Sequence, residues 1–194
     1  MQKSICVYCA SSQRCHPAYR DAARELGAIL ADHSFAIIYG GGAVGSMGAL
    51  ADGALARGGT IVGVLPRFMM DLEWGHQKLT ELRIVEDMRT RKHIMLSQSA
   101  GVVALPGGAG TLEELFEALT LKRLGLYLHP IVLVNTRNYF APLIDVLEHA
   151  VAEHFMGVRH REMWQVVAEP NDVPHALASA PAWTADARDF ATVR

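Results

Sequence analysis

The sequence has no long hydrophobic stretch and no large excess of charge of either sign. A membrane-spanning helix needs about 18 or more apolar residues, and no such run is present. The first residues, Met1 to Ser4, lead into neither the long apolar segment nor the cleavage site of a signal peptide. The 18 Lys and Arg residues nearly balance 20 Asp and Glu residues, so no general attraction to nucleic acid or anionic membrane is expected. We therefore expect a cytoplasmic protein that binds neither.

Cysteine is also scarce. The three cysteines, Cys6, Cys9 and Cys15, do not make the disulfide framework of a secreted domain. Cys6 and Cys9 have the CxxC spacing of redox and metal sites, but they lie in the apolar run 5–9. Such a run is typical of a strand, where residues three apart face opposite sides, whereas a redox CxxC pair needs a helix start. We expect structural thiols, and a functional CxxC pair is the less favoured alternative.

Several catalytic motifs are missing as well. The nine histidines form no HExxH pair and no Cys/His arrangement with zinc spacing, so no metal site is predicted. No serine lies in a GxSxG motif, and no GK[ST] follows a glycine-rich loop. The sequence therefore predicts neither a zinc hydrolase, nor an α/β-hydrolase, nor a Walker-type ATPase. The methionines Met47, Met69, Met70, Met88 and Met95 are expected in the core or in a pocket wall.

Short apolar runs alternate with amphipathic segments along the chain. The predicted strands are 4–9, 35–40, 60–65, 82–85, 101–105 and 130–134, with a weaker one at 165–168. The predicted helices are 17–32, 46–57, 88–97, 111–124 and 139–155, with a short one after Asn171. Several strands are continuously apolar, as expected when helices cover both faces of a parallel sheet. The pattern predicts an α/β fold with a Rossmann-like, doubly wound parallel sheet. We expect one domain, residues 1–180, and a loosely held C-terminal tail, residues 181–194.

The first glycine-rich loop, residues 39–48, follows a strand and opens a helix. Gly40, Gly42 and Gly45 satisfy the dinucleotide motif GxGxxG. The acidic residue that would bind a ribose hydroxyl about 20 residues later is missing, which disfavours a nicotinamide-dependent oxidoreductase. We expect Gly41 and Gly42 to let the backbone approach a nucleotide. A tight turn without a ligand remains the alternative.

The second glycine-rich loop, residues 106–111, leaves an apolar strand and enters a helix. Its glycines can turn backbone N–H groups toward a ligand, and the helix start adds the positive end of a dipole. The loop therefore predicts a phosphate site, with the acid Glu114 beside it. Thr111 and Glu114 also fit a capping box, which is the alternative explanation for both residues.

A basic segment lies between the two loops. Four of the residues in 83–92 are lysine or arginine, and the segment Met88-Arg89-Thr90-Arg91-Lys92 begins a helix. Cations at a helix start are disfavoured by the dipole unless an anion lies there. Arg91 can hold phosphate or ribose oxygens with its planar guanidinium, and Lys92 adds a point charge. A solvated basic face is the simpler alternative.

These motifs resemble the LONELY GUY family of cytokinin riboside 5′-monophosphate phosphoribohydrolases, whose members are often mislabelled as lysine decarboxylases. Pro106 to Glu114 fits the family's PGGxGTxxE pattern, and Met88 to Lys92 fits its MxxRK pattern. The Cys9-Ala10-Ser11-Ser12 segment and the first glycine loop support the match, which runs to about Phe155.

The resemblance implies a homodimer that hydrolyses AMP or N6-prenylated AMP to the free base and ribose 5-phosphate, without metal or organic cofactor. Arg91 and Glu114 would be the catalytic pair. The nucleotide would be bound by Ser12, Gly41, Gly42, Glu73, Met88, Lys92, Gly107, Gly108, Ala109, Gly110, Thr111, Leu112 and Glu113. Relatives often have other residues at Arg89, Ser46 and Ala109, and the differences at Ser46 and Ala109 leave the base preference open. The alternative is a carrier or sensor of a nucleotide or of molybdenum cofactor, which binds phosphate without catalysing a reaction.

Overall fold

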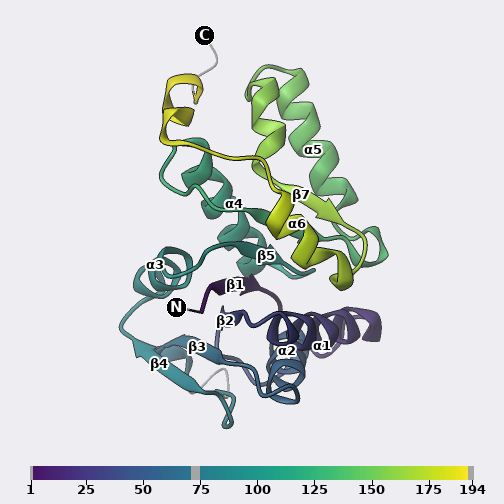
Figure 1. Ribbon diagram of the computed structural model, residues 1–194, viewed down its shortest axis with the longest axis vertical. Helices are drawn as coiled ribbons and strands as arrows, with labels where there is room; N and C mark the ends of the chain where they lie inside the picture. The colour runs from purple at the N-terminus through teal and green to yellow at the C-terminus, as the bar shows by residue number, and fades with distance from the viewer. Residues whose placement is uncertain (1, 71–74, 192–194) are drawn as a thin grey trace.

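The computed structural model describes residues 2–70 and 75–191, and in these residues seven strands form one sheet (Figure 1). The strand order is β4-β3-β2-β1-β5-β6-β7, and every neighbouring pair is parallel. The strands are β1 (Ser4–Tyr8), β2 (Ala36–Tyr39), β3 (Ile61–Pro66), β4 (Glu81–Val85), β5 (Val102–Ala104), β6 (Ile131–Val134) and β7 (Gln165–Val167). The predicted doubly wound α/β fold is confirmed.

Helices connect the strands. The α-helices are α1 (Pro17–Asp32), α2 (Gly45–Leu55), α3 (Met88–Ser97), α4 (Ala109–Arg123), α5 (Ala141–Ala152) and α6 (Val173–Ser179). Short 3₁₀ helices are η1 (Arg67–Met69), η2 (Thr136–Asn138), η3 (Val158–Met163), η4 (Pro170–Asp172) and η5 (Ala185–Phe190). Among the described residues, no helix has both the length and the apolar character to cross a membrane.

The direction of winding reverses at β1, which lies at the centre of the sheet. From β1 the chain moves outward through β2 and β3 to β4, and it then returns to pair β5 with the other side of β1. The loops that leave β1 and β5 therefore separate and open a crevice at the carboxyl edge of the sheet. Open α/β sheets bind their ligands at such a switch point.

Two apolar cores cover the two faces of the sheet. Side chains of α1, α2 and α6 pack on one face, and side chains of α3, α4 and α5 pack on the other. Figure 1 shows α3 on the opposite side of the sheet from α1 and α2. Cys6 belongs to one core and Cys9 to the other, and both are unbridged thiols. The predicted opposite orientation of these two cysteines is confirmed.

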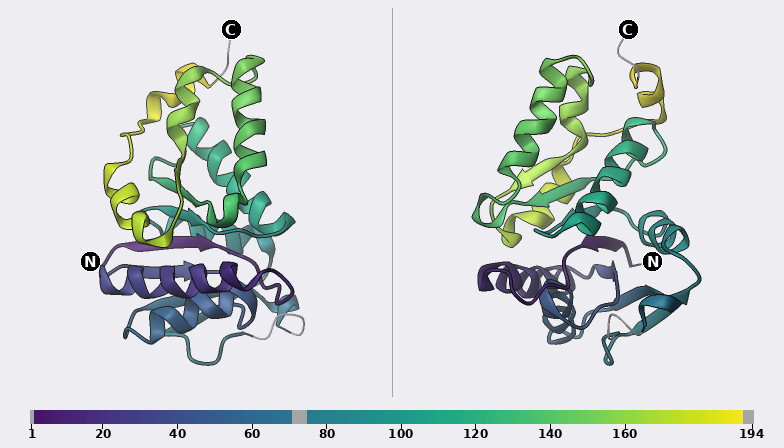
Figure 2. Two further views of the ribbon diagram at one scale, coloured as in Figure 1. Left: turned by 90° about the vertical axis from the view of Figure 1, so that its right-hand side faces the viewer. Right: turned by 180° about the vertical axis from the view of Figure 1, so that it is seen from behind.

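The C-terminal segment is packed and not loosely held up to residue 191, so the expectation for this part of the tail was wrong. It runs alongside α4 in the views of Figure 2. Trp183 and Ala187 are buried in the same core as α4. The Trp183 indole N–H donates to the Lys122 carbonyl at 2.7 Å, and Arg123 Nε donates to the Ala191 carbonyl at 2.9 Å. The apolar body of Trp183 explains this packing.

Lys122, in the last turn of α4, is a buried cation. Its ammonium donates to the His129 carbonyl at 2.8 Å and lies 5.8 Å from the centre of the Trp183 ring. No described carboxylate forms an ion pair with it. Burial lowers the pKa of Lys122 to about 8.

Replacing Lys122 should change how stability depends on pH. Between pH 8 and about 10.4 the unfolded chain binds more protons at this lysine, so its contribution to the free energy of unfolding rises with pH. The buried Cys6 thiol, whose pKa is raised by burial, acts in the opposite direction. The contribution of Lys122 is therefore measured as the difference in the free energy of unfolding between wild type and a Lys122 variant. We expect Lys122→Met to be more stable than wild type at pH 7 by about 1–2 kcal/mol, with the difference shrinking toward pH 10.

Urea unfolding at several pH values between 7 and 10 measures this difference. The variant Lys3→Met, at an exposed lysine, serves as the control and should keep the wild-type pH dependence. Parallel stability curves for wild type and Lys122→Met would contradict the assignment.

Candidate active site

A cavity of about 350 Å³ lies where the loops after β1 and β5 separate. Its walls come from the loop after β1, the first turn of α2, η1, α3 and the start of α4. The lining residues are Cys9, Ala10, Ser11, Ser12, Met47, Met69, Met88, Arg91, Gly108, Gly110, Thr111, Glu113 and Glu114. The two predicted catalytic residues, Arg91 and Glu114, thus share one cavity with most of the second glycine loop.

The first turn of α4 presents backbone N–H groups to this cavity. Gly108 is the N-cap, has no side chain that could cap the helix, and no acidic residue lies in the first turn. The first intrahelical bond runs from the Leu112 N–H to the Gly108 carbonyl, so the preceding amides have no partner within the helix. A methyl group added at Gly108 or Gly110 would meet no atom within 4 Å. Free amides, open space and the helix dipole together make a site for an anion.

The capping-box explanation of Thr111 and Glu114 is wrong. Helix α4 begins at Ala109, so Thr111 is its third residue and Glu114 lies in the second turn. The Thr111 side chain packs against Gly107, where any side chain would overlap it. Both Thr111 and Glu114 are buried in the cavity wall. Helix capping therefore does not account for the acid at position 114.

Arg91 is buried without an acidic partner among the described residues. One of its Nη atoms donates to the Gly40 carbonyl at 3.3 Å, and the other lies 3.7 Å from the Met69 sulfur and 3.6 Å from the Met88 sulfur. Its Nε is buried without a hydrogen-bond partner. A buried guanidinium that contacts mainly thioethers is electrostatically costly, and an anion bound in the cavity would offset that cost.

The anion that stabilises the start of α3 is part of the protein. Asp87 is the N-cap of α3, and its side chain accepts a hydrogen bond from the Thr90 N–H at 2.7 Å. This bond holds the pKa of Asp87 below its usual range. The basic residues at the start of α3 therefore do not by themselves indicate a bound ligand. A bound ligand is indicated instead by the burial of Arg91.

The glycines of the first loop support the site and do not line it. A side chain at Gly40 would overlap the Arg91 guanidinium and displace it. Gly45 has φ +63°, and a side chain on it would meet the backbone of Ser11 and Ser12. The Met47 N–H donates to the Ala10 carbonyl at 3.1 Å. The loop thus fixes the position of Arg91 and of the segment after β1.

The two glycines predicted to bind the nucleotide, Gly41 and Gly42, are not among the described residues that line the cavity. Gly41 has φ +84° and packs against the side chains of Leu65 and Leu82. Gly42 forms an isolated antiparallel bridge with Gly75. In this structure the two glycines form a turn, and their contact with a nucleotide stays a prediction.

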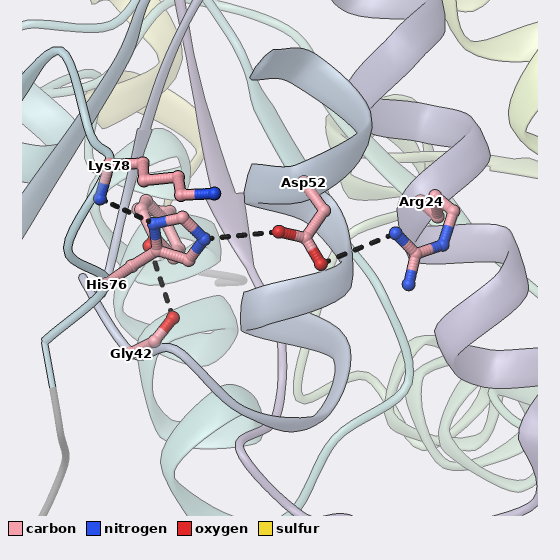
Figure 3. Close-up of polar contacts among 6 residues, drawn as sticks. Arg24, Gly42, Asp52, His76 and Lys78 are labelled. Carbon is pink, nitrogen blue, oxygen red and sulfur yellow. Dashed lines mark hydrogen bonds and ion pairs between the residues drawn. The ribbon is translucent and has the colours of Figure 1, made fainter. Parts of the chain in front are cut away.

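A histidine clamp holds the outer side of this loop (Figure 3). The backbone N–H of His76 donates to the Gly41 carbonyl at 3.1 Å, and the backbone N–H of Lys78 donates to the imidazole Nδ1 of His76 at 3.2 Å. Since Nδ1 accepts, Nε2 carries the proton and donates to Asp52 at 3.2 Å. Arg24 pairs with the same carboxylate at 3.4 Å. The clamp therefore joins α1, α2 and residues 75–78 to the loop.

The remaining predicted residues have other positions. Lys92 is not among the lining residues, because its ammonium pairs with Glu113 and, at 3.1 Å, with Glu117. Gly107 lines a smaller adjoining cavity of about 170 Å³ with Tyr19 and Tyr139, and the Tyr139 hydroxyl donates to its carbonyl. Ala109 is exposed at the start of α4, and Leu112 packs on the core. Glu73 lies outside the described residues.

Part of the cavity wall was not assigned to the site from sequence. Cys9, Ala10 and Ser11 line it from the segment after β1. The core or pocket-wall prediction is confirmed for Met47, Met69 and Met88, which line the cavity, and for Met95, which is buried in the core. It was wrong for Met70, which is exposed. The signal that could have identified Ala10 and Ser11 was their place after the central strand, directly before a helix.

Known proteins resemble this chain in sequence and in fold. A family model described as "Possible lysine decarboxylase" matches residues 47–177. A cytokinin riboside 5′-monophosphate phosphoribohydrolase of Rhodococcoides fascians is 43% identical over 79% of this chain and 78% of its own length. The cytokinin riboside 5′-monophosphate phosphoribohydrolase LOG3 of Arabidopsis thaliana is 38% identical over 88% of this chain and 80% of its own length. The chain belongs to the LONELY GUY family.

Solved structures agree on the fold. A molybdenum cofactor carrier protein of Chlamydomonas reinhardtii has a TM-score of 0.69 and 23% identity, covering 92% of this chain and 100% of its own. The molybdenum cofactor binding protein of Rippkaea orientalis has a TM-score of 0.71 and 20% identity, covering 92% of this chain and 97% of its own. At these identities the likeness shows the fold alone, and the site of this LONELY GUY family member must be judged on its own residues.

Gly110→Ala should separate folding from anion binding. The added methyl meets no atom in the structure, and alanine favours a helix, so the free energy of unfolding should stay equal or rise by up to about 0.5 kcal/mol. The same methyl occupies space in front of the α4 amides. We expect ribose 5-phosphate, measured by titration calorimetry, to bind at least about tenfold more weakly, a loss of about 1.4 kcal/mol.

The variant Thr120→Ala, at an exposed position farther along α4, is the matched control and should bind as wild type does. Unchanged affinity in Gly110→Ala would show that the anion binds elsewhere.

Proposed function

We propose that this protein hydrolyses the N-glycosidic bond of a purine nucleoside 5′-monophosphate, either AMP or its N6-substituted cytokinin form, to the free base and ribose 5-phosphate. One observation carries the proposal. The uncapped start of α4 opens into a cavity whose wall also contains a buried arginine, Arg91, and a buried acid, Glu114. The names of the curated relatives support the same reaction.

The phosphate would bind to the amides of residues 109–111. Their dipoles and free N–H groups suit a doubly charged phosphomonoester, and the hydroxyls of Ser12 and Thr111 line the same space. Binding at this point provides energy remote from the bond that is cleaved, and it positions the ribose for the reaction. Ribose and base would then extend toward Arg91, Glu114 and the methionine wall.

Glu114 is the proposed catalytic acid residue at the reacting carbon. Departure of the base builds positive charge on the ribose ring, and a nearby carboxylate stabilises that charge or activates the attacking water. Water adds its oxygen to C1′, the C1′–N bond breaks, and the proton released from water balances the one taken up by the base. Arg91 would orient the ribose and phosphate oxygens with the donors that have no acidic partner.

The thioether wall would contact the base. Met47, Met69 and Met88 line the cavity beside Arg91. Their side chains are apolar and adaptable, so they suit a flat purine and can rearrange around a substituent on it. The proposal therefore covers both AMP and N6-substituted AMP.

Glu114→Gln and Arg91→Ala should abolish most turnover. Each removes a charge that acts on the transition state, so we expect the turnover number for AMP to fall by about 100-fold or more. The measurement is chromatographic detection of free base, with ribose 5-phosphate determined in parallel and expected in equal amount. Arg89→Ala and Glu86→Gln change neighbouring residues outside the proposed site and should retain wild-type turnover.

Two results would count against the proposal. Near-normal release of base by both site variants would remove Glu114 and Arg91 from the mechanism. Nucleotide binding by the wild-type protein without any release of base would favour a carrier or sensor.

A further inference from the structure

An ion-pair bridge joins the two helices that carry the proposed catalytic residues. Lys92 on α3 contacts Glu113 and Glu117 on α4, and its distance to the Glu117 carboxylate is 3.1 Å. We call these three residues the Lys92 bridge. The hydrogen bond from Glu113 raises the pKa of Lys92, so the ammonium stays charged. Its side chain is only 16% exposed, which limits screening by salt.

Each helix places a bridge residue directly beside a catalytic one. Successive residues of an α-helix point about 100° apart. Arg91 therefore faces the cavity while Lys92 faces α4, and Glu114 faces the cavity while Glu113 reaches Lys92. Any movement of the bridge thus moves the backbone of both proposed catalytic residues.

The bridge also crosses a gap between the helices. A second cavity of about 760 Å³ is lined by α3 residues, among them Lys92 and His93, and by α4 residues, among them Glu117 and Leu121. Glu113 lines the first cavity, and Lys92 and Glu117 line the second. The bridge is therefore the wall between the two cavities. Side-chain contacts across this gap therefore act together with the packing of both helices on the sheet to fix the distance between the helices.

We propose that Lys92 is a positioning residue, which acts through Glu113 and Glu117 to hold Arg91 and Glu114 at the spacing that the reaction needs. The inference rests on the proposed function of the site. It replaces the expected role of Lys92 as a substrate ligand. Two carboxylates already neutralise its ammonium, and they would repel a phosphate brought near it.

The two roles predict different kinetics. A displacement of about 1 Å between catalytic groups is enough to lower the rate by up to 100-fold. Lys92→Met should therefore reduce the turnover number for AMP by about 10- to 100-fold. The inhibition constant of ribose 5-phosphate should change by less than about twofold, because the α4 amides are intact. Lys92→Arg, which can still pair with both acids, should recover most of the turnover.

Glu117→Gln provides the sharpest distinction. Glu117 lies on α4 outside the first cavity, and its replacement by glutamine weakens the ion pair with Lys92. A positioning role predicts a lower turnover number with an unchanged inhibition constant for ribose 5-phosphate. A ligand role predicts the opposite, since releasing Lys92 from an acid would make it more available and tighten binding. Arg83→Met, which removes another paired cation near the end of α3, is the control and should behave as wild type.

The outcomes separate this inference from the proposed function. If wild type releases base from AMP and Lys92→Met weakens ribose 5-phosphate binding by about tenfold or more, the positioning role is overturned and the function stands. If Lys92→Met keeps full turnover, the positioning role is also overturned. If wild type releases no base, the proposed function fails, and the positioning role for that reaction fails with it.

Discussion

The structure depends on a concentration of positive potential around one cavity with a single buried acid beside it. The uncapped start of α4 and the Arg91 guanidinium both face this space, and neither has an acidic partner there among the described residues. Such an arrangement is unfavourable in an empty protein because the Arg91 guanidinium is buried and its Nε has no hydrogen-bond partner. A bound phosphomonoester would satisfy both, and it would bring its sugar next to Glu114. The open space that this binding needs would explain why the helix start carries glycines and not a capping side chain.

The two glycine-rich loops have different roles in the structure. In the loop after β5, Gly108 and Gly110 leave open space that a ligand can fill. In the loop after β2, the space beside Gly40 is filled by the Arg91 guanidinium, and the space beside Gly45 is filled by the backbone of Ser11 and Ser12. Both lie at the carboxyl edge of the sheet on either side of β1, so they meet at the crevice that the reversal of strand order creates. The histidine clamp around His76 and the Lys92 bridge then hold the supporting segments from outside the cavity.

Much of this could be predicted from the sequence, because continuously apolar strands and periodic helices depend on local patterns. The PGGxGTxxE and MxxRK motifs also contain Glu114 and Arg91, which the fold brings into one cavity. Other features depend on tertiary contacts. The start of α4 was predicted two residues late, since glycine is a poor indicator of a helix. Adjacent cations such as Arg91 and Lys92 look alike in sequence, and only packing shows that one is buried in the cavity and the other bridges two helices. Trp183 appeared to lie in a loose tail because its partner, the end of α4, is distant in sequence.

The most direct test is a crystal structure of the Glu114→Gln variant with AMP bound. The variant should bind the nucleotide and cleave it slowly enough to be observed. The account predicts the phosphate on the amides of residues 109–111, the ribose beside Arg91, and C1′ next to the side chain at position 114. A nucleotide bound with its phosphate elsewhere, and with the start of α4 free of ligand, would contradict the account.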